Sequence, residues 1–169
     1  MQVMKRILAI GYFIRSFRAL MRFGELSRAP LKLLRFQVQG DVAECEWLAR
    51  SADPWDAHLP SEVGEQHVSE QALQDAIVIR ELLFSTLPGV DTAALRIFRH
   101  SRSGEPELII TGVVARENQA MRYLFSLAMR AKLLGLQFLL ENGILMALCP
   151  EFLELKSVQR DTSRLEVGA

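Results

Sequence analysis

The sequence is poor in cysteine and has no excess of charge of either sign. Only two cysteines, Cys45 and Cys149, occur among 169 residues, which is too few for a disulfide framework and favours a reducing, cytoplasmic location. The 20 lysines and arginines balance 20 aspartates and glutamates, so the composition excludes a generally basic nucleic-acid-binding protein. Because half of the residues are hydrophobic, we expect one globular domain of about 100–200 residues.

Sequence motifs that carry chemistry are also missing. The chain has no glycine-rich phosphate loop, no Gly-x-Ser-x-Gly nucleophile motif and no dinucleotide fingerprint, and its histidines, cysteines and acids match no metal-site spacing. Cys45 and Cys149 each follow an apolar strand pattern, where cysteine behaves as a small, inert hydrophobic residue. The sequence therefore nominates no catalytic residue, metal or cofactor, and a non-enzymatic protein is the favoured expectation.

A membrane-spanning run is absent near the start of the chain. Only eight residues separate Arg6 from Arg15, whereas a transmembrane helix needs about 20 apolar residues. A secretory signal would need small residues at its cleavage site, where Arg15, Ser16, Phe17 and Arg18 stand instead. The basic, acid-poor composition is also that of an organelle transit peptide, which stays open as an alternative. We otherwise expect this segment to lie on a surface.

Charge is strongly segregated along the chain. Residues 1–35 hold eight bases against one acid, a net charge of +7, whereas residues 36–91 hold two bases against eleven acids, a net charge of −9. Asymmetry of this size suggests that the basic end meets an anionic surface or partner. The alternative, which we weigh equally, is that the basic segment folds back on the protein's own acidic middle.

Residues 3–23 predict a helix with two different faces. Apolar side chains recur at the helical period and form one stripe: Ile10, Phe13, Ile14, Phe17, Leu20 and Met21. At about 100° per residue, Arg15, Arg18 and Arg22 gather opposite this stripe. Such a helix suits an anionic membrane, a groove on a partner protein, a second copy of the chain, or the protein's own domain. Binding of nucleic acid is disfavoured, because Phe13 and Phe17 lie away from the arginines, whereas stacking on bases needs aromatic and basic side chains interleaved.

Three hairpins are predicted. The first covers residues 33–48, with Gly40-Asp41 as its two-residue turn. This turn sets a register in which one face is apolar, with Val38 opposite Ala43, Phe36 opposite Cys45 and Leu34 opposite Trp47. The other face is polar, with Arg35 opposite Glu46. Residues 95–100 and 108–115 read as strands, and Gly112 in the second indicates a bulge or a close backbone approach. Residues 136–140 and 144–149 flank Asn142-Gly143, a strong hairpin turn, and their continuous apolar character predicts that both faces are covered.

Two core helices complete the predicted fold. The helical period covers residues 70–87, and again residues 118–134, with Asn118 as N-cap and Gly135 at the C-terminal end. We therefore predict an α+β fold: a mainly antiparallel sheet of three hairpins, about six strands, with two core helices on one face and a basic amphipathic N-terminal helix. Residues 1–28 are the helix and its link, residues 31–150 form a single α+β domain, and residues 151–169 are a polar tail.

Residues 50–69 are predicted to form a long, acidic surface loop, because they lack a period and contain two prolines and a glycine. Their candidate partner- or ligand-binding residues are Asp53, Trp55, Asp56, His58 and His67. The favoured function is an adaptor-type interaction domain that residues 3–23 tether to an anionic membrane surface or a protein partner. The alternative is a small enzyme or ligand-binding domain, which requires the polar side chains of the 50–69 loop to converge.

Overall fold

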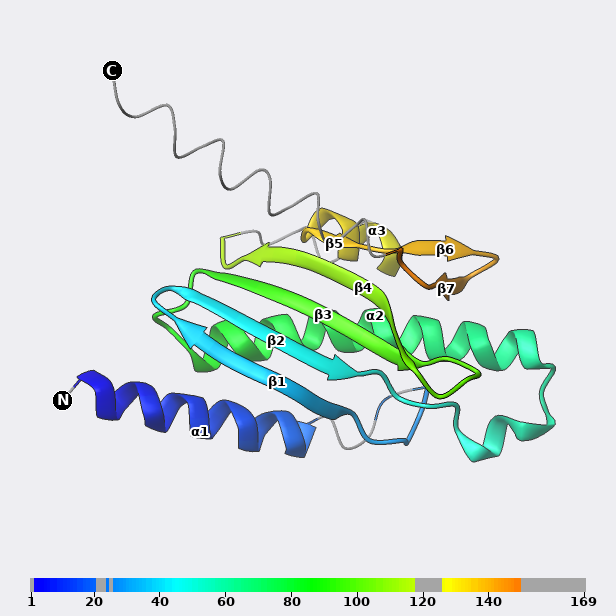
Figure 1. The fold of residues 1–169 in the computed structure, drawn as a ribbon, viewed down its shortest axis with the longest axis horizontal. Helices are drawn as coiled ribbons and strands as arrows, with labels where there is room; N and C mark the ends of the chain where they lie inside the picture. Colours follow the sequence, from blue (N-terminus) through cyan, green and yellow to red (C-terminus); the bar gives the residue numbers. More distant parts are fainter. Residues whose placement is uncertain (1, 21–23, 25, 118–125, 150–169) are drawn as a thin grey trace, which may run out of the picture.

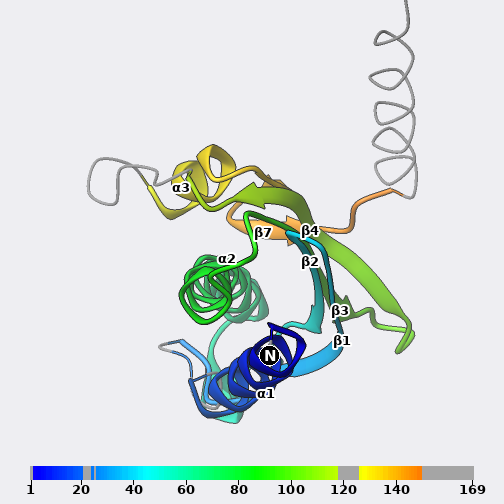
Figure 2. The same cartoon turned by 90° about the vertical axis from the view of Figure 1, so that its left-hand side faces the viewer.

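The structure, a computed structural model, describes residues 2–20, 24, 26–117 and 126–149. A curved five-stranded sheet has the strand order β1-β2-β3-β4-β5, and β6 and β7 form a separate hairpin (Figure 1). The helices lie on the concave side of the sheet (Figure 2). The predicted α+β class is confirmed. The elements, in order, are α1 Gln2–Leu20, β1 Lys32–Gln39, β2 Val42–Leu48, the 3-10 helix η1 Pro54–His58, α2 Ser61–Thr86, β3 Thr92–His100, β4 Pro106–Ala115, α3 Leu127–Leu133, β5 Leu136–Gln137, β6 Leu139–Glu141 and β7 Ile144–Met146.

The sheet is mostly antiparallel, as predicted, but β2 and β3 pair in parallel, with Trp47 opposite Ile97. This pairing follows from the connection, because α2 carries the chain back across the concave face before β3 begins. The expectation of about six strands in one sheet is wrong among the described residues. The third hairpin does not join the main sheet, which gains only the short strand β5.

The predicted register of the first hairpin is confirmed as far as Arg35. Val38 lies opposite Ala43, Phe36 opposite Cys45, and Arg35 opposite Glu46. An irregularity between Leu33 and Arg35 then places Leu33, rather than Leu34, opposite Trp47. Leu34 is consequently 46% exposed instead of joining the core.

Two ion pairs connect the outer face of this part of the sheet. Arg35 lies 3.9 Å from Glu44, its diagonal neighbour, rather than contacting Glu46. Glu46 instead accepts a 2.6 Å hydrogen bond from Arg96 on β3. The neighbouring parallel strand, which the hairpin pattern does not reveal, therefore decides the partner of Glu46.

Helix α2 begins at Ser61, nine residues before the predicted start, so the loop prediction for residues 50–69 is wrong over residues 61–69. Pro60 occupies the N-cap position and Glu62 lies in the first turn, where a negative charge suits the helix dipole. The first two turns are mostly exposed or half-buried, so they need no apolar stripe. Residues Pro54–His58 form η1.

The C-terminal part of the fold is only partly described. Helix α3 begins after Ser126, whose hydroxyl accepts a 3.3 Å hydrogen bond from the amide of Met129. The predicted N-cap Asn118, with residues 118–125, and the predicted tail 151–169 lie outside the described residues. Positive φ angles at Asn142 (51°) and Gly143 (80°) confirm the predicted turn between β6 and β7. However, Leu139 and Leu140 are exposed, so the prediction that both faces of this hairpin are covered is wrong. Strand β7 packs on α2, whereas β6, among the described residues, contacts mainly its partner strand β7.

Gly112 marks a close backbone approach, as its position in the strand predicted. A Cβ atom there would collide with the carbonyl oxygen of Gly135 and would lie 2.9 Å from Cα of Leu136. The absence of a side chain lets β5 and the turn before it pack against β4.

Helix α1 is part of the hydrophobic core. Phe13 and Phe17 are 0% and 1% exposed, and the ring of Phe13 stacks on that of Phe36 with 4.4 Å between centroids. The helix also packs against α2, and it lies beside β1 in both views (Figures 1 and 2). The expectation that Phe13 and Phe17 contact a membrane or a partner is therefore wrong, because the stripe's aromatic residues pack on the protein's own sheet.

Candidate functional site

One candidate surface is the solvent side of α1. Five large apolar side chains there are between 57% and 72% exposed: Val3, Met4, Ile7, Leu8 and Tyr12. Arg15 and Arg18 continue the same side in the last turns of the helix and are exposed. At about 100° per residue, Met4, Leu8 and Arg15 lie opposite Phe13 and Phe17, and Ile7, Tyr12 and Arg18 lie to either side of them. Val3, in the first turn, borders the side of Phe17 but is exposed. We call Val3, Met4, Ile7, Leu8, Tyr12, Arg15 and Arg18 the outer face of α1.

The fold fixes the orientation of this outer face. Phe13 and Phe17 anchor one side of the helix in the core, and the guanidinium of Arg6 donates a hydrogen bond to the carbonyl oxygen of Gly40 in the β1–β2 turn. Rolling α1 about its axis would expose two phenylalanine rings. The outer face is therefore presented to solvent without any rearrangement of the helix.

The residues predicted for tethering divide into three groups. Phe13 and Phe17 are buried, and Ile10 and Ile14 are half-buried against the core. Arg15 and Arg18 are exposed, as the tethering hypothesis requires. Leu20 is the last residue of α1, and Met21 and Arg22 lie outside the described residues.

Sequence reasoning missed the exposed apolar residues of α1 because it followed a single stripe. The available signal was the composition of residues 3–12, which is apolar on nearly every side of a helix. A helix that buries one side in a domain leaves the remaining apolar residues in water. Apolar patches on the surface of a monomer often mark interaction sites.

The second candidate surface is built around η1. The Asp53 carboxylate accepts hydrogen bonds from the amides of Trp55 and Arg28, each at 3.0 Å, and these bonds hold the pKa of Asp53 below its usual value. Pro54 restricts the turn further. Trp55 projects from this rigid turn and is 74% exposed.

The structure brings together some of the polar residues predicted for residues 50–69. Asp56 and His67 approach to 3.3 Å between Oδ2 and Nδ1, because the early start of α2 places His67 beside η1. Asp53 and Trp55 lie on the same turn as Asp56. His58 is exposed and lines neither of the hollows beside the turn.

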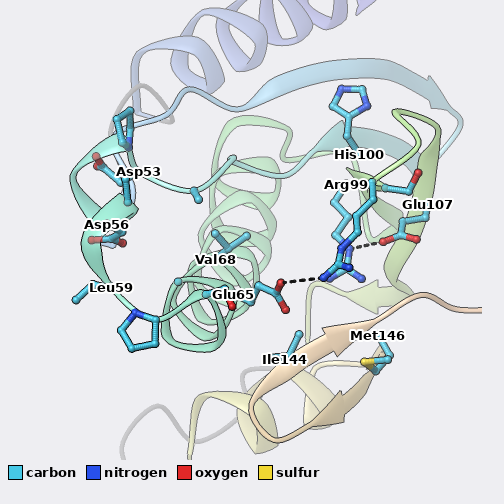
Figure 3. A pocket seen from close by; sticks show the side chains of 18 residues that line it. Asp53, Asp56, Leu59, Glu65, Val68, Arg99, His100, Glu107, Ile144 and Met146 are labelled. Carbon is cyan, nitrogen blue, oxygen red and sulfur yellow. Dashed lines mark hydrogen bonds and ion pairs between the residues drawn. The ribbon is translucent and has the colours of Figure 1, made fainter.

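Two hollows flank the turn that carries Trp55. The larger, of about 840 Å³, lies between η1 with the start of α2 and the β3–β4 hairpin with β7 (Figure 3). Leu59, Val68, Ile144 and Met146 supply apolar lining. The smaller hollow, of about 520 Å³, includes Trp55 in its lining. Asp53 and Asp56 line both hollows.

Charges of both signs line the larger hollow. Arg99 donates a 2.5 Å hydrogen bond to Glu107 and another of 2.6 Å to the carbonyl oxygen of Leu145. Arg102 is fully exposed and lies 4.0 Å from Glu65. Both arginines of the β3–β4 hairpin thus lie near a carboxylate: Arg99 near Glu107 on the same hairpin, and Arg102 near Glu65 on α2 across the hollow.

A buried polar network supports both surfaces and was not predicted from the sequence. Arg50 and Asp75 are 3% and 4% exposed, and the Arg50 guanidinium donates to Asp75 at 2.8 Å and to the carbonyl oxygen of Ala29 at 2.6 Å. Gln71 donates to Asp75 and accepts a 2.6 Å hydrogen bond from the amide of Leu26. Burial raises the pKa of Asp75, against the opposing effect of Arg50. The network fastens the link between α1 and β1 to α2, so its role is positional.

The two cysteines differ. Cys45 is buried, and burial raises the pKa of its thiol well above the usual range, so it is a poor nucleophile in the folded protein. Cys149 is exposed, which corrects the expectation that it is buried. Within the described ranges, no group of three or more histidine, cysteine or acidic side chains is placed to hold a metal ion.

No helix in the described part of the chain combines the length and the apolar character that crossing a bilayer requires. Comparison with protein-family models, with curated proteins and with solved structures finds no match to this chain.

Proposed function

We propose that this protein is a non-enzymatic, adaptor-type interaction domain of the cytoplasm, held on an anionic membrane surface through the outer face of α1. The observation that carries this proposal is the pairing of four exposed apolar side chains, Met4, Ile7, Leu8 and Tyr12, with Arg15 and Arg18 on one fixed side of a helix, and Val3 borders this side. A helix at a membrane interface buries apolar side chains at the headgroup boundary while its basic side chains attract anionic lipid. The proposal replaces the stripe of Phe13 and Phe17 by the opposite side of the same helix.

The energetic terms are large enough for reversible binding. A large apolar side chain contributes about 1.5–3 kcal/mol when it is fully buried, and partial insertion of five such side chains gives several kcal/mol. Each lysine or arginine near an anionic surface adds about 1 kcal/mol. A protein partner with an acidic, apolar groove would meet the same chemistry, but a membrane needs no complementary shape.

Sedimentation with vesicles tests the proposal. Wild-type protein is expected to sediment with vesicles that contain phosphatidylserine and to stay in solution with vesicles of phosphatidylcholine alone. The variant Arg15→Ala/Arg18→Ala loses about 2 kcal/mol, which is roughly a 30-fold weaker binding. The variant Ile7→Ser/Leu8→Ser is expected to lose binding to the vesicles that contain phosphatidylserine.

Val113→Ser is the matched control for the apolar variant, because Val113 is also exposed (40%) but lies on β4, away from α1. Its binding should equal that of the wild type. Equal binding of wild type to anionic and neutral vesicles, or unchanged binding of Ile7→Ser/Leu8→Ser, would reject the membrane proposal.

A second candidate function is ligand binding at the surface around η1. The specific observation in its favour is the hollow of about 840 Å³, which falls in the range of about 300–1,000 Å³ typical of ligand sites. An enzyme at this place has less support. Ser61 and Ser101 line the larger hollow, but among the described residues neither hydroxyl is hydrogen-bonded to His67, so the Asp56–His67 pair has no nucleophile in place.

A further inference from the structure

The surface around η1 has the features of a docking site for part of another protein. Trp55 lines the smaller of the two hollows beside η1, and tryptophan is enriched among the residues that dominate protein–protein binding. The turn that carries it is fixed by the two hydrogen bonds to Asp53 and by the contact between Asp56 and His67. Because the turn is already ordered, little conformational entropy is lost when a partner binds.

The charge of this surface indicates the chemistry of the partner. Every charged residue that η1, its N-cap and α2 contribute to the larger hollow is acidic: Asp53, Asp56 and Glu65. On the opposite side, Arg99 and Arg102 each lie beside a carboxylate, and His100 is exposed and contacts the carbonyl oxygen of Gly104. The lining of the larger hollow holds four carboxylates against two guanidinium groups. The smaller hollow holds Asp53 and Asp56 against the single guanidinium of Arg28, so both favour a cation over an anion.

Apolar side chains and an aromatic ring accompany the acids. Val68 on α2 and Ile144 and Met146 on β7 supply apolar surface to the hollow from two neighbouring elements (Figure 3). The exposed ring of Trp55 can receive a lysine or arginine, because tryptophan is the best aromatic partner for a cation. A surface of this kind fits a segment in which a basic residue stands close to an apolar one.

We propose that the surface around η1 docks a basic, partly apolar segment of a partner protein, with its lysine or arginine between Trp55 and Asp56 and its apolar side chain over Val68 and Met146. This inference deepens the second candidate function by naming its ligand class. It is independent of the membrane contact, since α1 contributes no residue to either hollow. A protein that binds an anionic membrane at one surface and a basic segment at another would link the two.

A peptide-display selection tests the inference. The full chain, without lipid, is the bait for a library of random ten-residue peptides, and Trp55→Ala is the counter-bait. We expect enrichment of peptides that combine lysine or arginine with a large apolar residue. Enrichment without a basic bias, enrichment of acidic peptides, or no enrichment over the counter-bait would each overturn the inference.

Affinity measurements with an enriched peptide then locate the contact. Trp55→Ala is expected to weaken binding at least about tenfold, and Asp56→Asn/Glu65→Gln about fivefold. Asp41→Asn/Glu117→Gln is the matched control, because it removes two exposed acids elsewhere and should change binding less than about twofold. Equal losses in both double variants would show general attraction to the acidic protein and would overturn the specific site. Ile7→Ser/Leu8→Ser should bind the peptide as wild type does, so failure of the membrane proposal is distinguishable.

Discussion

Replacing Phe13 by alanine tests whether α1 is an integral part of the fold. The ring is fully buried, stacks on Phe36 at 4.4 Å and lies 6.0 Å from Phe17. Phenylalanine-to-alanine changes in a core cost about 3–5 kcal/mol. That is a large share of the roughly 5–15 kcal/mol by which a domain is stable, and it lowers Tm by roughly 6–20 °C for a chain of this length.

The adjacent residue provides the matched control. Tyr12 is 57% exposed on the same helix, so Tyr12→Ala removes an aromatic ring of similar size but costs about 1 kcal/mol or less. Urea unfolding followed by circular dichroism gives both free energies. If Phe13→Ala loses no more stability than Tyr12→Ala, α1 does not pack on the sheet as described, and the assignment of an inner and an outer face fails.

Three further predictions concern the rest of the fold. The backbone amides of Trp55 and Arg28 lower the pKa of Asp53, so its carboxylate stabilises the fold above the unfolded pKa of about 4 and loses this effect as pH falls through the lower folded value. The Tm difference between wild type and Asp53→Asn should therefore be constant above about pH 5 and shrink as the pH falls below about 4; a difference that does not change with pH would contradict this role. An aromatic disulfide reagent at pH 8 should modify Cys149 at once and Cys45 only after unfolding; two fast thiols in the folded chain would contradict the burial of Cys45. Gly112→Ala should lower the free energy of unfolding in urea by about 1–3 kcal/mol, because the added Cβ meets backbone atoms. Gly64→Ala, in open space on α2, should raise it by about 1 kcal/mol, and equal effects of the two changes would refute the close approach at Gly112.

Local patterns predicted those elements whose partners are close in sequence. The alternation around Gly40-Asp41 fixed the pairing of Phe36 with Cys45, and Asn142-Gly143 formed the expected turn. In both cases the turn residues and the strands they join lie within a few positions of each other. The bulge at Leu34 escaped prediction because it lies at the far end of the strand from the turn, where the turn residues no longer set the register and strict alternation assumes a regular ladder.

Features that depend on distant contacts were beyond the sequence. Residues 61–69 form two helical turns that are mostly solvated, and a solvated helix shows no apolar period. The ion pair of Arg50 with Asp75 joins the end of β2 to the middle of α2, and neither residue stands in a recognisable motif. For the candidate sites, the position of Trp55 and Asp56 among acids and prolines was enough to identify them from the sequence. The apolar stripe of α1 was assigned to an external surface, but Phe13 and Phe17 pack on the protein's own sheet instead.

The central claim is that the outer face of α1 enters an anionic membrane surface while the helix stays docked. The most direct measurement places an environment-sensitive fluorophore on a cysteine at Leu8 in a Cys149→Ser background, with Val78, 44% exposed on α2, as the comparison position. Addition of phosphatidylserine vesicles should shift the emission at position 8 to shorter wavelength and leave position 78 unchanged. An unchanged spectrum at position 8, with the protein folded and lipid in excess, would contradict the account.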